Sequence, residues 1–117
     1  MRALTTAVSV TAILFAGAIF GFFYAWVCST MWGLDQADPR VAIQAMQAMN
    51  ASVRNAVFFP AFFLTPVVMG LAAFLILRSG QKTSAAFFGV GALVYLALGL
   101  LLTAAINVPM NEALALV

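Results

Sequence analysis

The chain has 117 residues, of which 66% are hydrophobic and only 7% are charged, and its mean hydropathy is +1.13. Soluble domains carry about 25% charged residues, so five Lys or Arg and three Asp or Glu cannot cover a water-soluble fold of this size. The net charge of +2 is too small to suggest a nucleic-acid partner, and there is no basic stripe, so we expect none. We therefore expect one all-α integral membrane domain over residues 1–117, with lipids as its solvent.

The first apolar run extends from about Leu4 to Trp32. It is long enough to cross a bilayer as a helix, which needs roughly 20 residues. Gly17, Gly21 and Tyr24 share one face of this helix. The GxxxG pattern of the two glycines predicts close helix packing, whereas the tyrosine hydroxyl either supports packing or meets a ligand.

Residues 33–56 follow the first span, and their pattern predicts an amphipathic helix over about residues 39–56. Asp38 is suited to cap this helix and Pro39 to occupy its first position. The helix leads into the second span. Its polar face is expected to carry Gln44, Gln47, Asn50 and Arg54.

The second span covers about residues 57–77. A single helix from Pro39 to Leu77 would be about 58 Å long, which exceeds the bilayer. Since Pro60 removes a backbone donor, we expect a bend near this residue.

The third span covers about residues 84–107 and follows a short basic turn, RSGQKTS. Gly80 is expected to end the second span, and Thr83 or Ser84 to cap the third. The expected fold is therefore three transmembrane helices and one amphipathic helix on the outer side.

The distribution of basic residues predicts the orientation of the chain. Arg2, Arg78 and Lys82 lie at one end without any acidic residue, whereas Arg40 and Arg54 at the other end are balanced by all three acids. Basic residues favour the cytoplasmic side. We expect a bacterial inner-membrane protein with a cytoplasmic N-terminus and with the long loop and C-terminus outside.

Polar residues from two distant segments are expected to meet on the outer side. Polar groups at membrane depth usually face a bundle interior or a cavity. If Arg54 shares a helix face with Gln47 and Asn50, it supplies a fixed cation for an anionic or phenolate oxygen. Asn107 and Asn111 arrive on the same side from the third span.

A simpler reading of these residues is structural. In this alternative Asn107 ends a helix, Pro109 forces a turn and Asn111 caps the next segment. Arg54 then reaches the lipid headgroups. Tyr95 of the third span, like Tyr24, is expected to point into the bundle, with its hydroxyl available to a ligand.

The chain contains little conventional catalytic chemistry. It has no histidine, which removes the commonest ligand of haem iron, copper and zinc, so we expect no metal site. Glu112 is the one carboxylate near the asparagines and the only plausible general base there.

The segments AMQAMN (residues 45–50) and TAAINVPMNEAL (residues 103–114) resemble the signature segments of the anthrone oxygenase family. That family has a glycine-rich first span, an A-M-Q-x-[IM]-N segment and a T-x-x-x-N-V-P-[LM]-N-[DE]-x-L segment. The resemblance covers nearly the whole chain. The matching positions are Gly17, Gly21, Met46, Gln47, Asn50, Thr103, Asn107, Val108, Pro109, Asn111, Glu112 and Leu114.

The resemblance implies a membrane-embedded helical bundle. In the characterised fungal branch it implies oxidation of an anthrone to an anthraquinone by molecular oxygen, with no established cofactor. The expected catalytic residues are Glu112 as base with Arg54 and Asn107 as oxyanion donors. The expected substrate-binding residues are Gln47, Asn50, Asn111, Tyr24 and Tyr95.

Two features depart from the family. A usual fourth span is absent after Val117, and the histidine often invoked in the fungal enzymes has no counterpart. Two hypotheses therefore stand side by side. One is an enzyme that binds or oxidises a lipophilic phenol or quinone, and the other is a non-enzymatic homo-oligomer or accessory subunit of a membrane complex.

Overall fold

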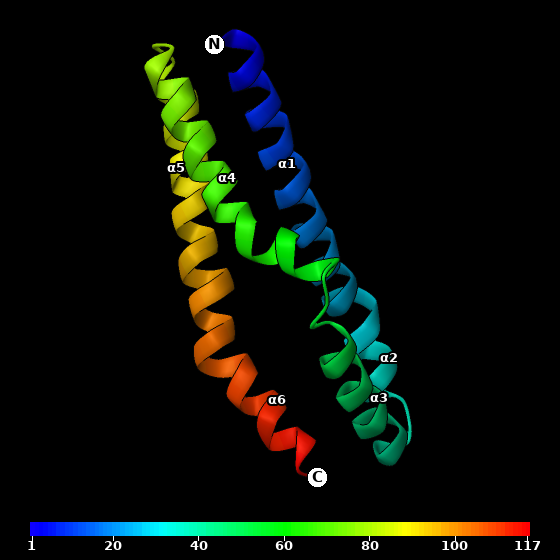
Figure 1. Cartoon of the computed structure of the whole chain (residues 1–117). Helices are drawn as coiled ribbons and strands as arrows, with labels where there is room; N and C mark the ends of the chain where they lie inside the picture. The colour runs from blue at the N-terminus through cyan, green and yellow to red at the C-terminus, as the bar shows by residue number, and fades with distance from the viewer.

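A computed structural model describes all 117 residues and confirms an all-α fold with three helices long and apolar enough to span a membrane (Figure 1). The first and third are continuous helices of 34 residues, which pass through π-helical turns, and the second has 21 residues. The molecule measures 55 × 24 × 23 Å. In chain order the elements are α1 (Arg2–Ala25), η1 (Trp26–Thr30), α2 (Met31–Asp35), α3 (Pro39–Ser52), α4 (Phe58–Arg78), α5 (Lys82–Val94), η2 (Tyr95–Leu101), η3 (Thr103–Asn107) and α6 (Val108–Ala115).

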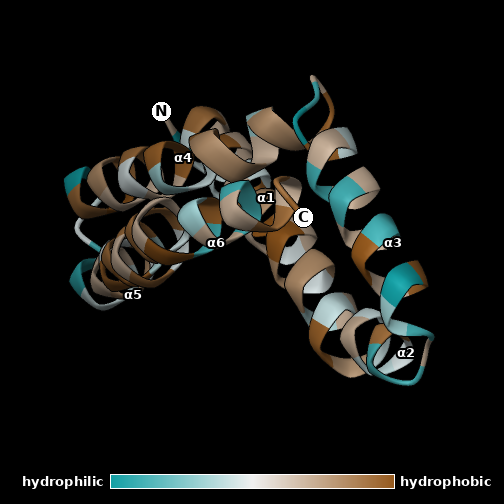
Figure 2. Ribbon diagram, turned by 90° about the horizontal axis from the view of Figure 1, so that it is seen from below, coloured by the Kyte–Doolittle hydropathy of each residue, from teal (hydrophilic) through white to brown (hydrophobic).

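The packed core lies between α1, α4 and α5, with α4 in contact with both of the others. It is built from small and aliphatic side chains, and its buried members are Ala12, Ala72, Ile76 and Ala85. Most other large apolar side chains are exposed, as expected of a domain whose solvent is lipid. Hydrophobic residues follow the long helices, whereas hydrophilic ones gather on α3 and in the connecting turns (Figure 2). The core therefore holds the three helices together in the half of the molecule that contains the N-terminus.

The outward face of α1 includes both glycines of the GxxxG pattern. Apart from the adjoining backbone of α1 itself, no atom lies within 4 Å of a Cβ built on Gly17 or Gly21. The expected close packing at these glycines is therefore not made by the chain's own helices. Tyr24 is 61% exposed and stacks on Phe20, with 5.7 Å between ring centroids. The expectation that Tyr24 points into the bundle is wrong.

The start of α3 confirms the predicted cap, because the Asp38 carboxylate accepts the backbone N–H of Arg40 at 2.9 Å and Pro39 is the first helical residue. The predicted end at residue 56 is wrong. α3 stops at Ser52, and residues 53–57 form an irregular turn, so the chain breaks before Pro60 rather than bending at it.

The physical reason for this break is Asn55. Its Oδ1 accepts the backbone N–H groups of Val57 and Phe58 at 2.8 and 2.9 Å, and its Nδ2 donates to the Ser52 carbonyl at 2.5 Å. A side-chain amide that satisfies the backbone in this way competes with helix continuation. Arg54 lies in the turn, so the predicted helix face shared with Gln47 and Asn50 does not extend to it.

The turn between α4 and α5 confirms Gly80 as the stop, with φ of 87°. The Gln81 N–H donates to the Ile76 carbonyl, five residues back, which closes a Schellman turn. Because the turn is complete at Gln81, α5 begins at Lys82. The predicted caps at Thr83 and Ser84 are therefore wrong.

The third long helix continues beyond its predicted end at Asn107, as far as Ala115. In η3 the Val108 N–H donates to the Thr103 carbonyl, five residues back. The turn just before Pro109 is therefore a π-helical turn, which contains about one residue more than an α-helical turn. This register lets the helix pass a residue that lacks an N–H. The predicted turn at Pro109 and cap at Asn111 are wrong.

Candidate functional site

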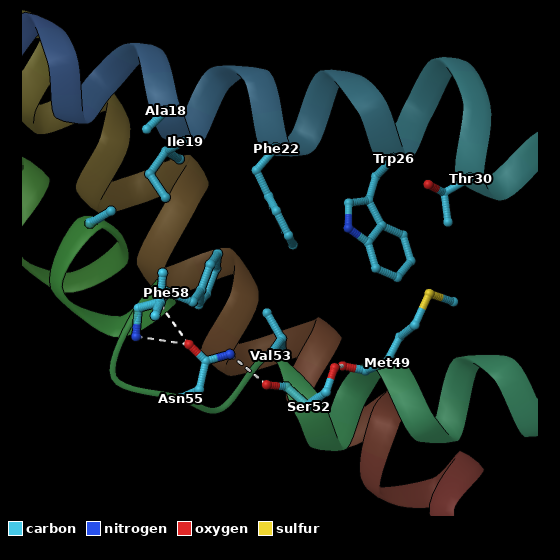
Figure 3. Close-up of a pocket in the computed structure, with 12 residues that line it drawn as sticks. Ala18, Ile19, Phe22, Trp26, Thr30, Met49, Ser52, Val53, Asn55 and Phe58 are labelled. Carbon is cyan, nitrogen blue, oxygen red and sulfur yellow. Dashed lines mark hydrogen bonds between the residues drawn. The ribbon is translucent and has the colours of Figure 1, made fainter.

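A groove of about 590 Å³ lies where the C-terminal half of the first long helix faces the 53–57 turn (Figure 3). Its two walls come from α1 with η1, and from α3 with the start of α4. We call this cavity the groove. It is lined by Ala18, Ile19, Phe22, Trp26, Thr30, Met49, Ser52, Val53, Asn55, Val57, Phe58 and Ala61.

The first wall is a single helical stripe. Ala18, Phe22, Trp26 and Thr30 follow one another at intervals of four residues, which keeps them on one face of the helix. The Phe22 and Trp26 rings have centroids 6.0 Å apart. Across the groove, the Phe58 ring lies 4.8 Å from that of Phe22. Aromatic faces thus bound the groove at its middle.

The second wall depends on the turn held by Asn55. All the hydrogen bonds of its amide go to the local backbone, so Asn55 shapes the wall. The Ser52 hydroxyl donates to the Met49 carbonyl at 3.2 Å, which leaves its oxygen free to accept a hydrogen bond. Thr30 lies at the outer end of the first wall, across from Met49 (Figure 3). The twelve lining residues include no acid, lysine or arginine, so the groove presents apolar and aromatic surface with a few uncharged polar groups.

None of the eight residues that the sequence suggested for the site lines the groove. Three of them, Gln47, Asn50 and Asn111, lie on α3 and α6, which pack against each other. We call these three residues the polar seam. Gln47 Nε2 donates to the Leu114 carbonyl at 2.9 Å. Since α6 packs against no distant element except α3, its half-buried Asn111 faces α3.

Asn50 is the unusual member of the polar seam. Its Nδ2 is shielded from solvent and has no hydrogen-bond partner in the chain. The two helices run in opposite directions (Figure 1), so the contact between Gln47 and Leu114 places Asn50 level with Asn111. The two signature segments therefore do come together, and their contact includes an unused amide donor.

The three residues expected to be catalytic are all exposed. Arg54 lies in the turn after α3, Asn107 at the end of η3 and Glu112 on α6. Asn107 and Glu112 lie toward the end that holds the C-terminus, and the turn between α3 and α4 that holds Arg54 lies near the middle of the molecule (Figure 1). The structure therefore places them near the polar seam but buries none of them.

Tyr95 points into the bundle, as expected, but its hydroxyl is engaged by the protein. It donates to the Phe62 carbonyl at 2.6 Å. Pro66 lies inside α4 and has no N–H, so it leaves the carbonyl four residues earlier, that of Phe62, without a helical partner. Tyr95 satisfies that carbonyl, which is a structural role.

The side-chain polar groups of the groove and of the polar seam themselves are amides, hydroxyls and the indole N–H of Trp26. No three Asp, Glu or Cys side chains gather anywhere in the chain. No family model, curated protein or solved structure matches the chain.

Sequence reasoning missed the groove. The four-residue spacing from Ala18 to Thr30 was a usable signal for its first wall. The second wall had none, because it exists only where the chain breaks at residues 53–57.

Proposed function

We propose that this chain is an integral membrane protein that binds a lipophilic phenol- or quinone-type molecule in the groove. The observation that carries the proposal is a cavity of about 590 Å³ walled by Phe22, Trp26 and Phe58. Small-molecule sites have volumes of roughly 300–1,000 Å³ and combine apolar walls with a few placed polar groups. The hydroxyls of Thr30 and Ser52 fill that last role.

Tryptophan fluorescence tests the proposal, because Trp26 lines the groove and Trp32 is 64% exposed. Trp32→Phe leaves Trp26 as the reporter in the groove, and Trp26→Phe leaves Trp32 as the matched control. Naphthol added to protein in phosphatidylcholine nanodiscs should quench Trp26 with a saturable curve and quench Trp32 only in proportion to its concentration. Equal, non-saturating quenching of both would refute binding in the groove.

From the resemblance to anthrone oxygenases we also propose a reaction, at the polar seam and the exposed residues near it, which lie outside the groove. Dioxygen is the oxidant, and a ring CH₂ flanked by phenolic rings becomes a carbonyl. One oxygen atom enters the product and the other leaves as water with the two hydrogens. Glu112 is the proposed base, with Arg54 and Asn107 as donors to the oxyanion. Gln47, Asn50 and Asn111 are the proposed substrate contacts beside them.

Oxygen uptake with anthrone as substrate tests this reaction. Glu112→Gln should lower the rate above the spontaneous background by about a hundredfold, and Gln44→Ala, on the exposed face of α3, should leave it unchanged. A rate equal to the background in the unmodified protein would limit the function to binding.

A second candidate function is that of a subunit in a larger membrane assembly. The two 34-residue helices are about 51 Å long, well beyond the roughly 30 Å of hydrocarbon. Their projecting parts expose large apolar side chains, among them Val27, Trp32 and Met110 at 64–67%. A homo-oligomer or partner chain would cover this surface. Native mass measurement of the protein in mild detergent distinguishes a monomer from such an assembly.

The proposed location is a bacterial inner membrane. The N-terminus and the turn that holds Arg78 and Lys82 face the cytoplasm, and α3, α6 and the C-terminus face outward. The excess of basic residues at the first end supports this orientation.

A further inference from the structure

The groove crosses the expected edge of the hydrocarbon layer. α4 has 21 residues, hence about 32 Å, and it ends at Arg78. If Arg78 lies at one interface, Phe58 at the start of α4 lies at the other. The Phe22 ring, 4.8 Å from the Phe58 ring, marks the same level on the first helix.

Counting along the first helix gives the same level. Ala18, Phe22 and Thr30 lie about 24, 30 and 42 Å from Arg2, respectively. The stretch from Ala18 to Phe22 is therefore within the acyl layer, whereas Thr30 is beyond it. Trp26 lies between them, close to the interface, where tryptophan is enriched in membrane proteins.

The chemistry of the walls changes along this same line. At the acyl end the groove is lined by Ala18, Ile19 and Ala61, which offer only apolar surface. Farther out the lining offers two hydroxyls, that of Ser52 near the middle of the groove and that of Thr30 at its outer end. The two ends are about 18 Å apart, since Ala18 and Thr30 are separated by three helical intervals of four residues.

The groove is also open at the level of the bilayer. Val57, on its lip, is 88% exposed, and Ala18 on the opposite wall is exposed as well. A molecule dissolved in the acyl layer therefore reaches the apolar end of the groove without crossing water.

We infer that the groove takes an oriented amphiphile directly from the leaflet on the α3 side. The apolar ring system lies beside Phe22 and Trp26, and an oxygen-bearing head lies toward the outer end of the groove, beside Thr30. The Thr30 hydroxyl donates to or accepts from the head. This inference rests on the proposed function and adds the source of the ligand and its direction in the site.

The first test concerns orientation and uses naphthol and naphthalene, which differ by one hydroxyl. Thr30→Val preserves side-chain volume and removes the hydroxyl. With the Trp26 reporter, it should weaken naphthol binding about fivefold and leave naphthalene binding unchanged. Thr103→Val is the matched control, because Thr103 is also half-buried in a π-helical turn but lies outside the groove.

The second test concerns the source of the ligand. The Trp32→Phe protein is placed in phosphatidylcholine vesicles that carry bromine on acyl carbons near the headgroup or near the methyl end. Shallow bromines should quench Trp26 more strongly than deep ones. Saturating naphthalene should reduce this quenching relative to plain vesicles, because it displaces an acyl chain from the groove.

The outcomes separate the two proposals. Saturable naphthol binding that Thr30→Val does not weaken, or a Trp26 that acyl bromines do not quench, overturns oriented loading from the bilayer and leaves binding in the groove intact. The absence of saturable quenching in the parent protein overturns both.

Discussion

Tyr95 shows how one side chain permits a proline within a membrane helix. A carbonyl without a partner in hydrocarbon is costly, because no water reaches it. Tyr95 removes that cost by donating to Phe62, opposite Pro66. The fully buried Thr65, whose hydroxyl donates to the Ala61 carbonyl, lies in the same stretch of α4. A residue that looked available to a ligand is thus committed to the backbone of its neighbour.

We predict that Tyr95→Phe lowers the free energy of unfolding by about 1–3 kcal/mol, because it leaves a buried carbonyl unpaired. Tyr24→Phe, on the exposed face of α1, should have almost no effect. Reversible unfolding in mixed micelles, followed by circular dichroism, measures both variants.

The same mechanism predicts non-additivity with Pro66. Pro66→Ala restores an N–H that can pair with the Phe62 carbonyl, so Tyr95→Phe should cost less in that background than in the parent. Equal costs in the two backgrounds would show that the hydroxyl stabilises the protein by some other contact.

The structural role of a residue could be predicted from the sequence where that role depends only on neighbouring residues. Asp38 with Pro39, and Gly80, were read correctly because a cap and a left-handed turn need only a few consecutive residues. Arg54 was misread because its expected face required a helix that reaches residue 56. The Asn55 amide ends the helix before that residue, because it accepts backbone N–H groups that a longer helix would use. The spacing of apolar residues gives no sign of this competition between side chain and backbone.

At the scale of elements, α6 is the least supported helix. It packs on α3 alone among distant elements, and the one side-chain hydrogen bond between them is that from Gln47 to the Leu114 carbonyl. Elements with few buried contacts open most readily. The polar seam is therefore expected to open and close more often than the core.

We predict that Gln47→Ala accelerates amide hydrogen exchange in α6 by about fivefold, since a hydrogen bond contributes about 1 kcal/mol. Gln44→Ala changes the same residue type on the exposed face of α3 and should not alter exchange. Peptide-resolved mass spectrometry in nanodiscs measures the difference. Unaltered exchange in both variants would mean that apolar packing alone holds α6.

Element lengths were harder to predict than element types. The three spans were recognisable from composition, but the third extends to Ala115 because a π-helical register carries it past Pro109. Proline usually signals an end, and nothing local distinguishes this exception.

At the scale of the whole molecule, two 34-residue helices and one of 21 residues produce a one-sided extension beyond the bilayer. The shorter helix sets the membrane thickness at the core, and α3 and α6 lie on the projecting side (Figure 1). The sequence was sufficient for the membrane class and the number of spans, because both follow from composition. The groove was not predictable, since its walls lie some 30 residues apart in sequence and meet only in three dimensions.

Cysteine labelling tests the orientation of this extension. In a Cys28→Ser background, Ala51→Cys on exposed α3 should react with a membrane-impermeant maleimide in intact cells, whereas Ser79→Cys in the α4–α5 turn should react only after lysis. The reverse pattern would place the extension in the cytoplasm.

The absence of any formal charge on the groove wall has a consequence for selectivity. Coulombic attraction weakens as electrolyte is added, but dispersion and desolvation of rings do not. The dissociation constant of a neutral ring compound should therefore be the same in dilute and concentrated salt, and in zwitterionic and anionic membranes. Such a site distinguishes ligands by the shape and size of their ring systems, and not by their charge.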